Sequence, residues 1–365
     1  MSDATENSSY DDVDYDETIA PASPFQEKYL GSDARIILAG GAAGSSKSYV
    51  GLMRHLRFAE DPDYRSYCIR KNSNAIMASG GLFWEAAELY RRYDPDLQIK
   101  LKDQKLVFSS GAEVSFSHYE NDAAAMKYQG IQISNIFFDE VTHLDNEDSF
   151  WWLWSRLRSK AKNTHSIWLS CNPDSDTWVL KYAKWYLYPE GHDLAGRPDP
   201  AKNGVIRYLL RINGEVVWGE TPEELQERYG YDKTPISFQG LFGTIEDNPP
   251  LMKAMPEYKQ SLEALPNLEK ERLLYGNWFA RPHADSFFTR DTIEEITETP
   301  PDSDFAKIVR AYDFASTLPH DGNKFPDYFA CVKMGKLHNG NYVILEALRT
   351  HISFGEWENF IITYS

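Results

Sequence analysis

The sequence is poor in cysteine and contains no long hydrophobic run. Its three cysteines, Cys68, Cys171 and Cys331, are scattered along 365 residues and form no CxxC pair. This spacing argues against a disulfide framework or a zinc ribbon and favours a reducing compartment. No apolar stretch approaches the roughly 18 residues of a membrane helix, and no basic-then-apolar signal region opens the chain. We therefore expect no association with a membrane.

Basic residues are absent from the first 24 positions, which carry seven acidic side chains. This segment is also poor in aliphatic residues, so we expect residues 1–24 to be a disordered acidic tail. The formal net charge of the chain is −17. Such a chain would not coat nucleic acid through its overall field, so contact with DNA requires a local patch. The stretch 153–184, with Lys160 and Lys181, is a candidate patch, and a solvated charged surface is the alternative.

Between residues 25 and 190, short apolar runs alternate with helical patterns. We expect strands at 35–39, 66–70, 133–138 and 166–170, a hairpin within 105–116, and helices at 49–58 and 150–158. Strands that alternate with helices predict an α/β fold with a mostly parallel sheet. Cytosolic enzymes, cytosolic motors and assembly proteins are the classes that remain.

The pattern changes after residue 190. We expect a loop at 191–203, a hairpin at 205–218, mostly helices at 221–276, strands at 308–313, 328–334 and 342–348, and a helix from residue 354. After the tail, the expected domains are a core at 25–190, a lid with a helical connection at 191–296, a linker at 297–306 and a C-terminal unit at 307–365. Three strands and part of a helix make a poor domain, so we expect this last unit to be incomplete.

A glycine- and serine-rich segment follows the first expected strand and opens the first expected helix. The segment GGAAGSSKS, residues 40–48, has the context that a phosphate-binding P-loop requires. Small residues let backbone N–H groups converge on phosphate oxygens, and the helix N-terminus favours negative charge. We expect Lys47 to reach the β- and γ-phosphates and the Ser48 hydroxyl to bind Mg²⁺. The residues expected around the nucleotide are Gly41, Gly44, Ser45, Ser46, Lys47 and Ser48.

One residue of this segment departs from the usual pattern, because Ser46 stands where glycine commonly precedes the lysine. A serine adds a side chain at that position, so we expect the loop to relax slightly. An ordinary Gly/Ser turn between a strand and a helix is the alternative to a P-loop.

A second part of the site is expected where the strand at 133–138 ends. The run IFFDE places Asp139 and Glu140 directly after apolar residues. Asp139 would then face the P-loop and hold Mg²⁺ through water, and Glu140 would act as the general base that polarises the attacking water. Acids that simply end a strand are the alternative.

Three further positions support the same site. Gln26 precedes the first strand and is expected to contact the adenine edge, with a plain surface role as the alternative. Arg70 ends the second strand and is expected to contact phosphate or a neighbouring subunit, or to form a structural ion pair. Ser170, Cys171 and Asn172 end the strand that follows Asp139 in sequence, where a polar cluster can sense loss of the γ-phosphate; an ordinary Asn-Pro turn is the alternative.

In this order, the motifs resemble those of the large terminase subunit of tailed bacteriophages, the ATP-driven motor that pumps viral DNA into a capsid. The resemblance begins near Phe25 and continues to the C-terminus. It depends on the GGxxGSSKS-type loop, the FFDE strand, the SCNP element, and the segments IEDNP (245–249) and YGNWF (275–279). It implies an ASCE-type P-loop ATPase domain with a lid, followed by the start of a nuclease domain of RNase H-like fold.

The resemblance also implies roles and partners. Lys47 and Ser48 would bind nucleotide and Mg²⁺, Asp139 would bind Mg²⁺, and Glu140 would be the catalytic carboxylate. Arg156 and Arg158 are candidates for an arginine that acts on a neighbouring subunit. The implied partners are double-stranded DNA, the portal protein, the small terminase subunit and further copies in a ring. The implied location is the host cell cytoplasm, with transient attachment to the procapsid.

The resemblance extends to a nuclease site. Asp313 ends a strand, as the first metal ligand of an RNase H-like site does, and Glu346 is a candidate neighbour or a surface carboxylate. A complete site needs several carboxylates for two divalent cations, Mg²⁺ or Mn²⁺. The remaining acids would be expected beyond Ser365, so we expect this chain not to cut DNA.

Two other functions compete with the packaging motor. One is an assembly protein that binds nucleotide without turnover, which the serine at position 46 would favour. The other is a helicase-like translocase, which would require a second motor domain; residues 190–365 show no second P-loop pattern.

Overall fold

The computed structural model describes residues 18–119, 127–162, 165–281, 296, 298–315, 318 and 328–364. They belong to two compact units, Met1–Pro282 and His283–Ser365. Most of the acidic tail expected at 1–24 lies outside the described residues, as does part of the linker expected at 297–306. Across the described residues, none of the helices combines the length and the apolar character that a membrane crossing needs.

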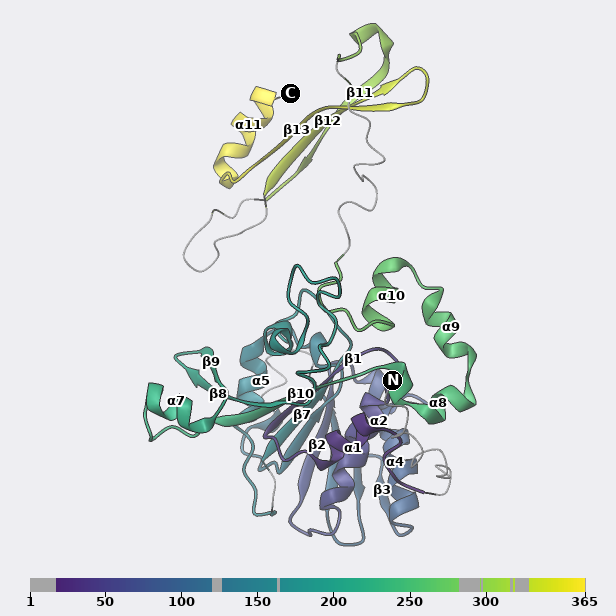
Figure 1. The fold of residues 1–365 in the computed structure, drawn as a ribbon, viewed down its shortest axis with the longest axis vertical. Helices are drawn as coiled ribbons and strands as arrows, with labels where there is room; N and C mark the ends of the chain where they lie inside the picture. Colours follow the sequence, from purple (N-terminus) through teal and green to yellow (C-terminus); the bar gives the residue numbers. More distant parts are fainter. Residues whose placement is uncertain are drawn as a thin grey trace, which may run out of the picture. The chain divides into compact units, whose positions relative to one another are not determined.

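The first unit is built on a sheet of ten described strands (Figure 1). The strands are β1 (Ile36–Gly41), β2 (Arg65–Arg70), β3 (Gln98–Lys100), β4 (Lys105–Val107), β5 (Glu113–His118), β6 (Asn135–Phe138), β7 (Ser166–Ser170), β8 (Ile206–Ile212), β9 (Glu215–Gly219) and β10 (Ile236–Gly243). Their order is β3-β4-β5-β2-β6-β7-β1-β10-β8-β9. The six strands from β5 to β10 in this order are parallel, so their carboxyl ends share one edge of the sheet.

Helices and short 3-10 turns connect these strands. The helices are α1 (Pro24–Gly31), α2 (Lys47–Met53), α3 (Asn74–Met77), α4 (Leu82–Tyr93), α5 (Glu147–Trp154), α6 (Leu180–Ala183), α7 (Pro222–Tyr229), α8 (Pro249–Ala254), α9 (Glu257–Glu263) and α10 (Asn267–Leu273). The 3-10 turns are η1 (Arg54–Phe58), η3 (Val141–His143), η4 (Lys184–Tyr186) and η5 (Ile245–Asp247). The helix expected at 49–58 is thus α2 followed by η1.

Successive side chains of the central strands point to opposite faces of the sheet, and the hydrophobic core therefore has two layers. Ile37, Phe137 and Trp168 belong to a cluster with α1, α2 and α4, whereas their neighbours Ile36 and Phe138 belong to a cluster with α5 and α6. Successive side chains of a strand point to opposite faces, and here both faces are apolar. Continuous apolar runs are typical of parallel strands covered on both sides, which explains why these runs lack polar alternation.

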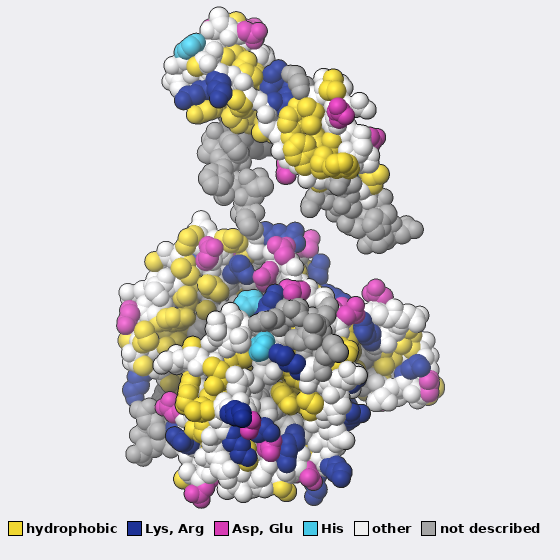
Figure 2. Space-filling model, turned by 180° about the vertical axis from the view of Figure 1, so that it is seen from behind, with side chains coloured by type: hydrophobic (Ala, Val, Ile, Leu, Met, Phe, Trp, Pro, Cys, Tyr) yellow, Lys and Arg dark blue, Asp and Glu magenta, His cyan; other side chains and the backbone are white. Residues whose placement is uncertain are grey.

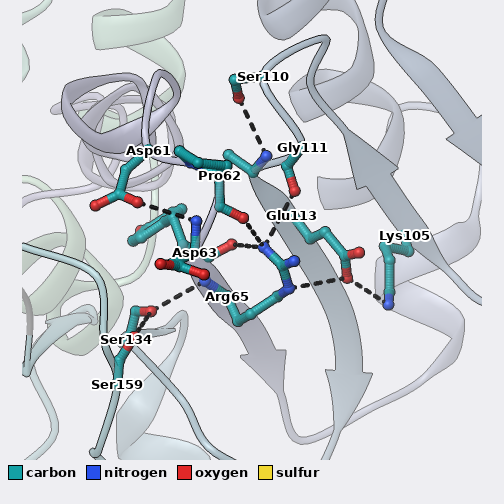
Figure 3. A network of polar contacts seen from close by, with 12 residues as sticks. Asp61, Pro62, Asp63, Arg65, Lys105, Ser110, Gly111, Glu113, Ser134 and Ser159 are labelled. Atoms are coloured by element: carbon teal, nitrogen blue, oxygen red, sulfur yellow. Dashed lines mark hydrogen bonds and ion pairs between the residues drawn. The ribbon is translucent and has the colours of Figure 1, made fainter.

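A polar network around Arg65, the first residue of β2, stabilises the edge of the sheet where the parallel strands begin (Figure 3). Its guanidinium donates to the carbonyl oxygens of Pro62 and Gly111 at 2.8 and 3.1 Å. Glu113 of β5 lies 3.7 Å from the Arg65 Nε and also pairs with Lys105 of β4 at 2.6 Å. This network joins three strands at the edge opposite the P-loop.

Two strands were not expected from the sequence, the short β3 and β10. The segment 221–276 was predicted to be mostly helical, but β10 lies within it and pairs in parallel with β1 from Ile36↔Phe238 to Gly41↔Gly243. Ile236, Phe238 and Phe242 are of residue types that favour a strand. The prolines at 249 and 250 come after this strand and begin α8. Because β8, β9 and β10 belong to the central sheet, residues 206–243 are part of the core architecture.

The second unit is a three-stranded antiparallel sheet in the order β11-β12-β13. Its elements are η7 (Asp302–Asp304), β11 (Phe305–Asp313), β12 (Phe329–Leu337), β13 (Tyr342–Thr350), η8 (Phe354–Glu356) and α11 (Trp357–Tyr364). All three strands expected near the C-terminus are therefore present, and each is longer than expected. Trp357 of α11 packs near Phe314 and Phe329 with ring centroids 4.8 and 6.2 Å apart.

Candidate functional site

A polar cavity of about 380 Å³ lies at the carboxyl edge of the parallel strands. This volume is within the usual range for small-molecule sites. The loops after β1, β6 and β7 reach it because these strands are neighbours in the sheet. Its walls are residues 43–49, 139–140 and 170–172, together with Glu85, Asn248 and Tyr258. The structure thus brings the predicted P-loop, the Asp-Glu pair and the SCNP element into one cavity.

The P-loop has backbone that only small residues adopt easily. Gly41 has φ 105°, and a Cβ there would lie 2.2 Å from the Gly243 carbonyl oxygen. Gly44 has φ 75°, and a Cβ there would meet the Tyr258 ring at 2.7 Å. Both positions therefore require glycine. Ser46, where glycine is usual, also lies in the left-handed region with φ 64°.

Lys47 begins α2 and its ammonium lies within the loop, close to the Ala42 carbonyl oxygen and 3.1 Å from Ser45 Oγ. The side chain is almost completely buried. Burial lowers the pKa of Lys47 to about 8, although Cys171 and Asp139 nearby act in the opposite direction. The ammonium donates to neutral oxygens of the loop, so a phosphate that enters the loop would give it a charged partner.

Asp139 follows β6 and is the most buried acid of the site, with 1% of its side chain exposed. Its Oδ1 accepts hydrogen bonds from the Ser48 hydroxyl at 2.9 Å and from the Ser170 hydroxyl. A hydroxyl and a carboxylate oxygen at this separation form the hard-oxygen donor set that Mg²⁺ prefers. Ser48 and Asp139 therefore fit a magnesium ion bound with nucleotide.

Glu140 stands beside Asp139 on the rim of the same cavity, and 44% of its side chain is exposed. Its backbone is left-handed, with φ 58°, which costs free energy for a residue other than glycine. The backbone turns sharply between β6 and η3 at this point. Glu140 Oε2 lies 3.5 Å from His143 Nδ1, a neighbour that the sequence did not identify. The exposed carboxylate has the access to water that a general base needs.

The element after β7 reaches the cavity through three consecutive residues. Ser170 is buried and contacts Asp139, and its Oγ also accepts the Glu140 N–H at 3.4 Å. Burial raises the pKa of the Cys171 thiol to about 12, so this thiol is neutral at physiological pH. Asn172 lines the cavity beside them. A role of this element in coupling stays a prediction.

Gln26 lies beneath the P-loop, with only 2% of the residue exposed. Its Nε2 donates to Ser46 Oγ at 2.8 Å and to the Asp247 carbonyl oxygen at 3.3 Å, and its Oε1 accepts the Ala22 N–H at 2.9 Å. Both amide N–H donors are therefore engaged with protein groups. A contact between Gln26 and adenine stays a prediction, and it would require one of these donors to be released.

Two residues that follow β10 line the cavity and were missed by sequence reasoning. Asn248 caps α8, and its Nδ2 donates to the Gly44 carbonyl oxygen at 2.7 Å. Tyr258 of α9 packs its ring against Gly44. Asn248 before two prolines carries a helix-cap signal, but nothing local indicates that this cap contacts a loop 204 residues earlier in the chain.

The candidate arginines lie away from this cavity. The backbone of Arg156 and of Arg158 pairs with Ile133, which precedes β6, so both residues are at the opposite edge of the sheet. The Arg156 guanidinium covers the Trp152 ring at 4.9 Å. A role for either arginine in a neighbouring subunit stays a prediction.

The role of a basic patch around Lys160 and Lys181 in DNA contact stays a prediction. The two residues lie at opposite ends of α5, because Lys181 pairs with Glu147 at the start of that helix whereas Lys160 follows its end. On the face shown in Figure 2, Lys and Arg side chains of the larger unit are interspersed with Asp and Glu.

The second unit does not join Asp313 to Glu346. Glu346 forms an ion pair with Arg310 at 2.5 Å across the sheet, in the register row Arg310↔Lys333↔Glu346. Asp313 is three residues further along β11 and therefore points to the other face. Among the described residues, no group of three or more His, Cys, Asp or Glu side chains is arranged to hold a metal ion. The pairing of Asp313 with Glu346 considered from the sequence is thus not supported.

Comparison with known proteins identifies a sequence family. Residues 37–295, more than half of the chain, match the family described as terminase large subunit, T4likevirus-type, N-terminal. No curated protein gives a significant match.

Several solved structures are also similar to this chain. The large terminase of a thermophilic bacteriophage shares 15% identity over 94% of this chain and 73% of that chain, with a TM-score of 0.47. That terminase has also been solved with ADP and with ATP-gamma-S. The ATPase domain of the Thermus phage P74-26 large terminase shares 13% identity over 70% and 92% of the two chains, with a TM-score of 0.43. The bacteriophage HK97 large terminase shares 12% identity over 93% of this chain and 65% of that chain, with a TM-score of 0.38.

Proposed function

The chain belongs to the T4likevirus-type family of large terminase subunits, and from this premise we propose that its cavity hydrolyses ATP with Mg²⁺ to drive double-stranded DNA into a viral capsid. One observation carries the proposal. Lys47, Ser48 and Asp139 come from two segments about ninety residues apart, yet Ser48 Oγ lies 2.9 Å from Asp139 Oδ1 at the wall of one cavity. A glycine-rich turn with only a structural role would not be expected to place a hydroxyl within hydrogen-bond distance of a buried carboxylate.

Each residue of the cavity would have a distinct role in ATP hydrolysis. Backbone N–H groups of the P-loop and the Lys47 ammonium would bind the phosphates. Ser48 and Asp139 would hold Mg²⁺, which neutralises developing charge on the phosphates when bound. Glu140 would orient water and accept its proton, since it is the exposed carboxylate next to Asp139. The Ser170 hydroxyl donates to Asp139, so a movement of Asp139 during hydrolysis would also shift the loop after β7.

The family suggests a wider assembly, which belongs to the same proposal. The subunit would act in a ring of copies on the portal protein, with the small terminase subunit as a further partner. It would work in the host cell cytoplasm and attach transiently to the procapsid. Cleavage of DNA with Mg²⁺ or Mn²⁺ would require carboxylates in addition to Asp313.

ATP turnover by the purified chain, with and without double-stranded DNA, tests the catalytic roles. We expect Glu140→Gln to bind ATP-gamma-S about as tightly as the wild type and to lose at least ~100-fold in kcat, the usual contribution of a general base. Lys47→Ala should lose binding as well. Glu60→Gln is the matched control, because Glu60 is exposed, contacts Tyr93 and does not line the cavity.

Two results would contradict parts of this proposal. Unimpaired turnover by Glu140→Gln would remove Glu140 as the base. Tight binding of ATP-gamma-S by the wild type without turnover, whether or not DNA is present, would instead favour an assembly protein that binds nucleotide.

A further inference from the structure

The buried carboxylate of Asp139 is shared between hydroxyl groups and a cation of the chain itself. Its Oδ1 accepts from Ser48 and Ser170. Its Oδ2 accepts from Arg70, whose Nε and Nη2 lie 2.6 and 2.5 Å away. A carboxylate with 1% exposure needs such compensation, because an unpaired buried charge is strongly unfavourable. Arg70 is the cation that is hydrogen-bonded to this carboxylate.

Arg70 is held firmly in this position. It ends β2, which pairs with β6 through Ile69↔Phe138, so its backbone lies beside the start of the Asp-Glu pair. A third guanidinium nitrogen, Nη1, donates to the Ala75 carbonyl oxygen at 3.2 Å. Only 17% of the side chain is exposed. The planar guanidinium thereby makes contacts that a single ammonium cannot reproduce.

Two more carboxylates surround the same guanidinium. Glu140 Oε1 lies 4.0 Å from Arg70 Nη2, and Glu85 of α4 lines the adjoining cavity. Burial alone would lower the pKa of Arg70, but Asp139 and Glu140 raise it above its ordinary value. Burial raises the pKa of Glu85, and Arg70 opposes that effect. The guanidinium is thus the cation around which these acids are arranged.

The position of Arg70 has a consequence for metal binding. A divalent cation at Ser48 and Asp139 would place two further positive charges beside the guanidinium, in a setting where burial reduces screening by water. The single negative charge of Asp139 cannot neutralise the divalent cation and the Arg70 guanidinium as well as it neutralises one of them. The triphosphate of a nucleotide changes this balance, because it brings negative charge to the same cavity.

We propose that Arg70 competes with the divalent cation for Asp139, so that the metal binds firmly only when it arrives with nucleotide phosphates. Arg70 would then be a positioning residue that couples the two ligands. The inference depends on the proposed function, in that it takes the cavity to be a site for metal and nucleotide. It assigns Arg70 a role in the order of binding rather than in direct contact with phosphate.

The test is a titration of the full-length chain with Mn²⁺ in the absence of nucleotide, followed by electron paramagnetic resonance. Arg70→Gln should bind Mn²⁺ at least ~10-fold more tightly than the wild type, since Asp139 loses its internal cation. The double variant Arg70→Gln with Asp139→Asn should lose this gain. Arg65→Gln is the matched control, because Arg65 begins the same strand, pairs with Glu113 and lies at the opposite edge of the sheet (Figure 3).

A second measurement follows from reciprocity between ligands. If Arg70 makes the metal depend on the nucleotide, ATP-gamma-S should increase Mn²⁺ affinity by a smaller factor in Arg70→Gln than in the wild type, and Mn²⁺ should increase ATP-gamma-S affinity by a correspondingly smaller factor. An arginine that merely supports the fold would leave these two factors unchanged.

Loss of one partner of a buried pair can destabilise the fold, so two safeguards are needed. Mn²⁺ alone should raise the Tm of Arg70→Gln by several degrees more than that of the wild type. If Arg70→Gln does not fold at all, Arg70→Lys keeps the charge with fewer contacts, and its Mn²⁺ affinity should still exceed that of the wild type.

The outcomes separate this inference from the proposed function. Unchanged or weaker Mn²⁺ affinity in the folded Arg70 variants would overturn the competition and show that Arg70 orients Asp139 for the metal. Failure of the wild-type chain to bind ATP-gamma-S, with or without Mn²⁺, would overturn the proposed function instead.

Discussion

Ser46 illustrates how a single residue can depart from a motif without loss of its geometry. Left-handed backbone costs a non-glycine residue about 1 kcal/mol or more. Ser46 has φ 64°, and its hydroxyl accepts from Gln26 and donates to the Ser45 carbonyl oxygen at 2.6 Å. A hydrogen bond of this kind contributes about 1 kcal/mol, which is comparable to the backbone cost. The serine is therefore accommodated by contacts that a glycine would not make.

Lys47 makes stability depend on pH in a direction that can be stated in advance. Burial lowers its pKa to about 8 in the folded chain from 10.5, so the unfolded chain binds more protons between these values. Stability contributed by this group then rises with pH across that window, and the cost of the buried charge is complete below pH 8. We expect Lys47→Met to be more stable than the wild type at pH 7, by roughly 1–3 kcal/mol, and the difference to shrink towards pH 10.

Urea unfolding without nucleotide at pH 7, 8.5 and 10 measures this difference. Lys100→Met is the control, since Lys100 is exposed on β3. A difference between Lys47→Met and the wild type that stays constant across the range would show that Lys47 is not the group that titrates.

The parts of the site that the sequence predicts are those fixed by neighbouring strands. Lys47 and Asp139 meet because β1 and β6 flank β7 in one parallel sheet, and loops at the carboxyl ends of such strands converge. Tyr258 could not be predicted, because its position depends on how the chain after β10 folds back. A structural ion pair was one of three roles considered for Arg70, and local sequence cannot choose between an ion pair and a phosphate contact.

At the scale of elements, the strand predicted best is a short one whose residues are all buried. The expected strand at 166–170 coincides with β7, whose five residues are all buried. β10 was missed because Gln239 and Gly240 interrupt its apolar run. Its partner β1 lies two hundred residues away, and a strand whose stability comes from so distant a neighbour carries a weak local signal.

The contact between α2 and the sheet offers a test at this scale. Gly51 of α2 lies so close to Phe137 of β6 that a Cβ would be 2.3 Å from the ring, and the Gly51 carbonyl oxygen accepts from Trp168 Nε1 at 3.1 Å. We expect Gly51→Ala to destabilise the fold by about 1–3 kcal/mol, because the rigid ring must move. It should also weaken nucleotide binding, since α2 carries the P-loop lysine.

Gly31→Ala is the matched control for that substitution. Gly31 ends α1, and a Cβ there would have no heavy atom within 4 Å. Its effect should stay within about 0.5 kcal/mol. Chemical denaturation of both variants checks the comparison, and equal effects would show that α2 is packed less tightly than its contact with Phe137 implies.

At the scale of the whole molecule, the two units differ sharply in how much core they contain. The first has two extended apolar clusters on the faces of its sheet and a third, smaller cluster around Ile245 in the segment after β10. Among the described residues of the second unit, the buried hydrophobic side chains are Phe329 and Cys331. A unit with so little buried apolar surface has little to offset the entropy of ordering its strands.

This contrast predicts two separate unfolding transitions for the full chain. The second unit should unfold at the lower temperature, with a small enthalpy, and the first unit at the higher temperature. ATP-gamma-S with Mg²⁺ should raise only the upper Tm, because a ligand stabilises the unit that binds it. Scanning calorimetry measures both transitions, and fluorescence of a Trp357→Phe variant assigns them, since Trp357 is the one tryptophan after residue 282. A single transition that shifts as a whole with nucleotide would mean that the second unit takes its stability from the first.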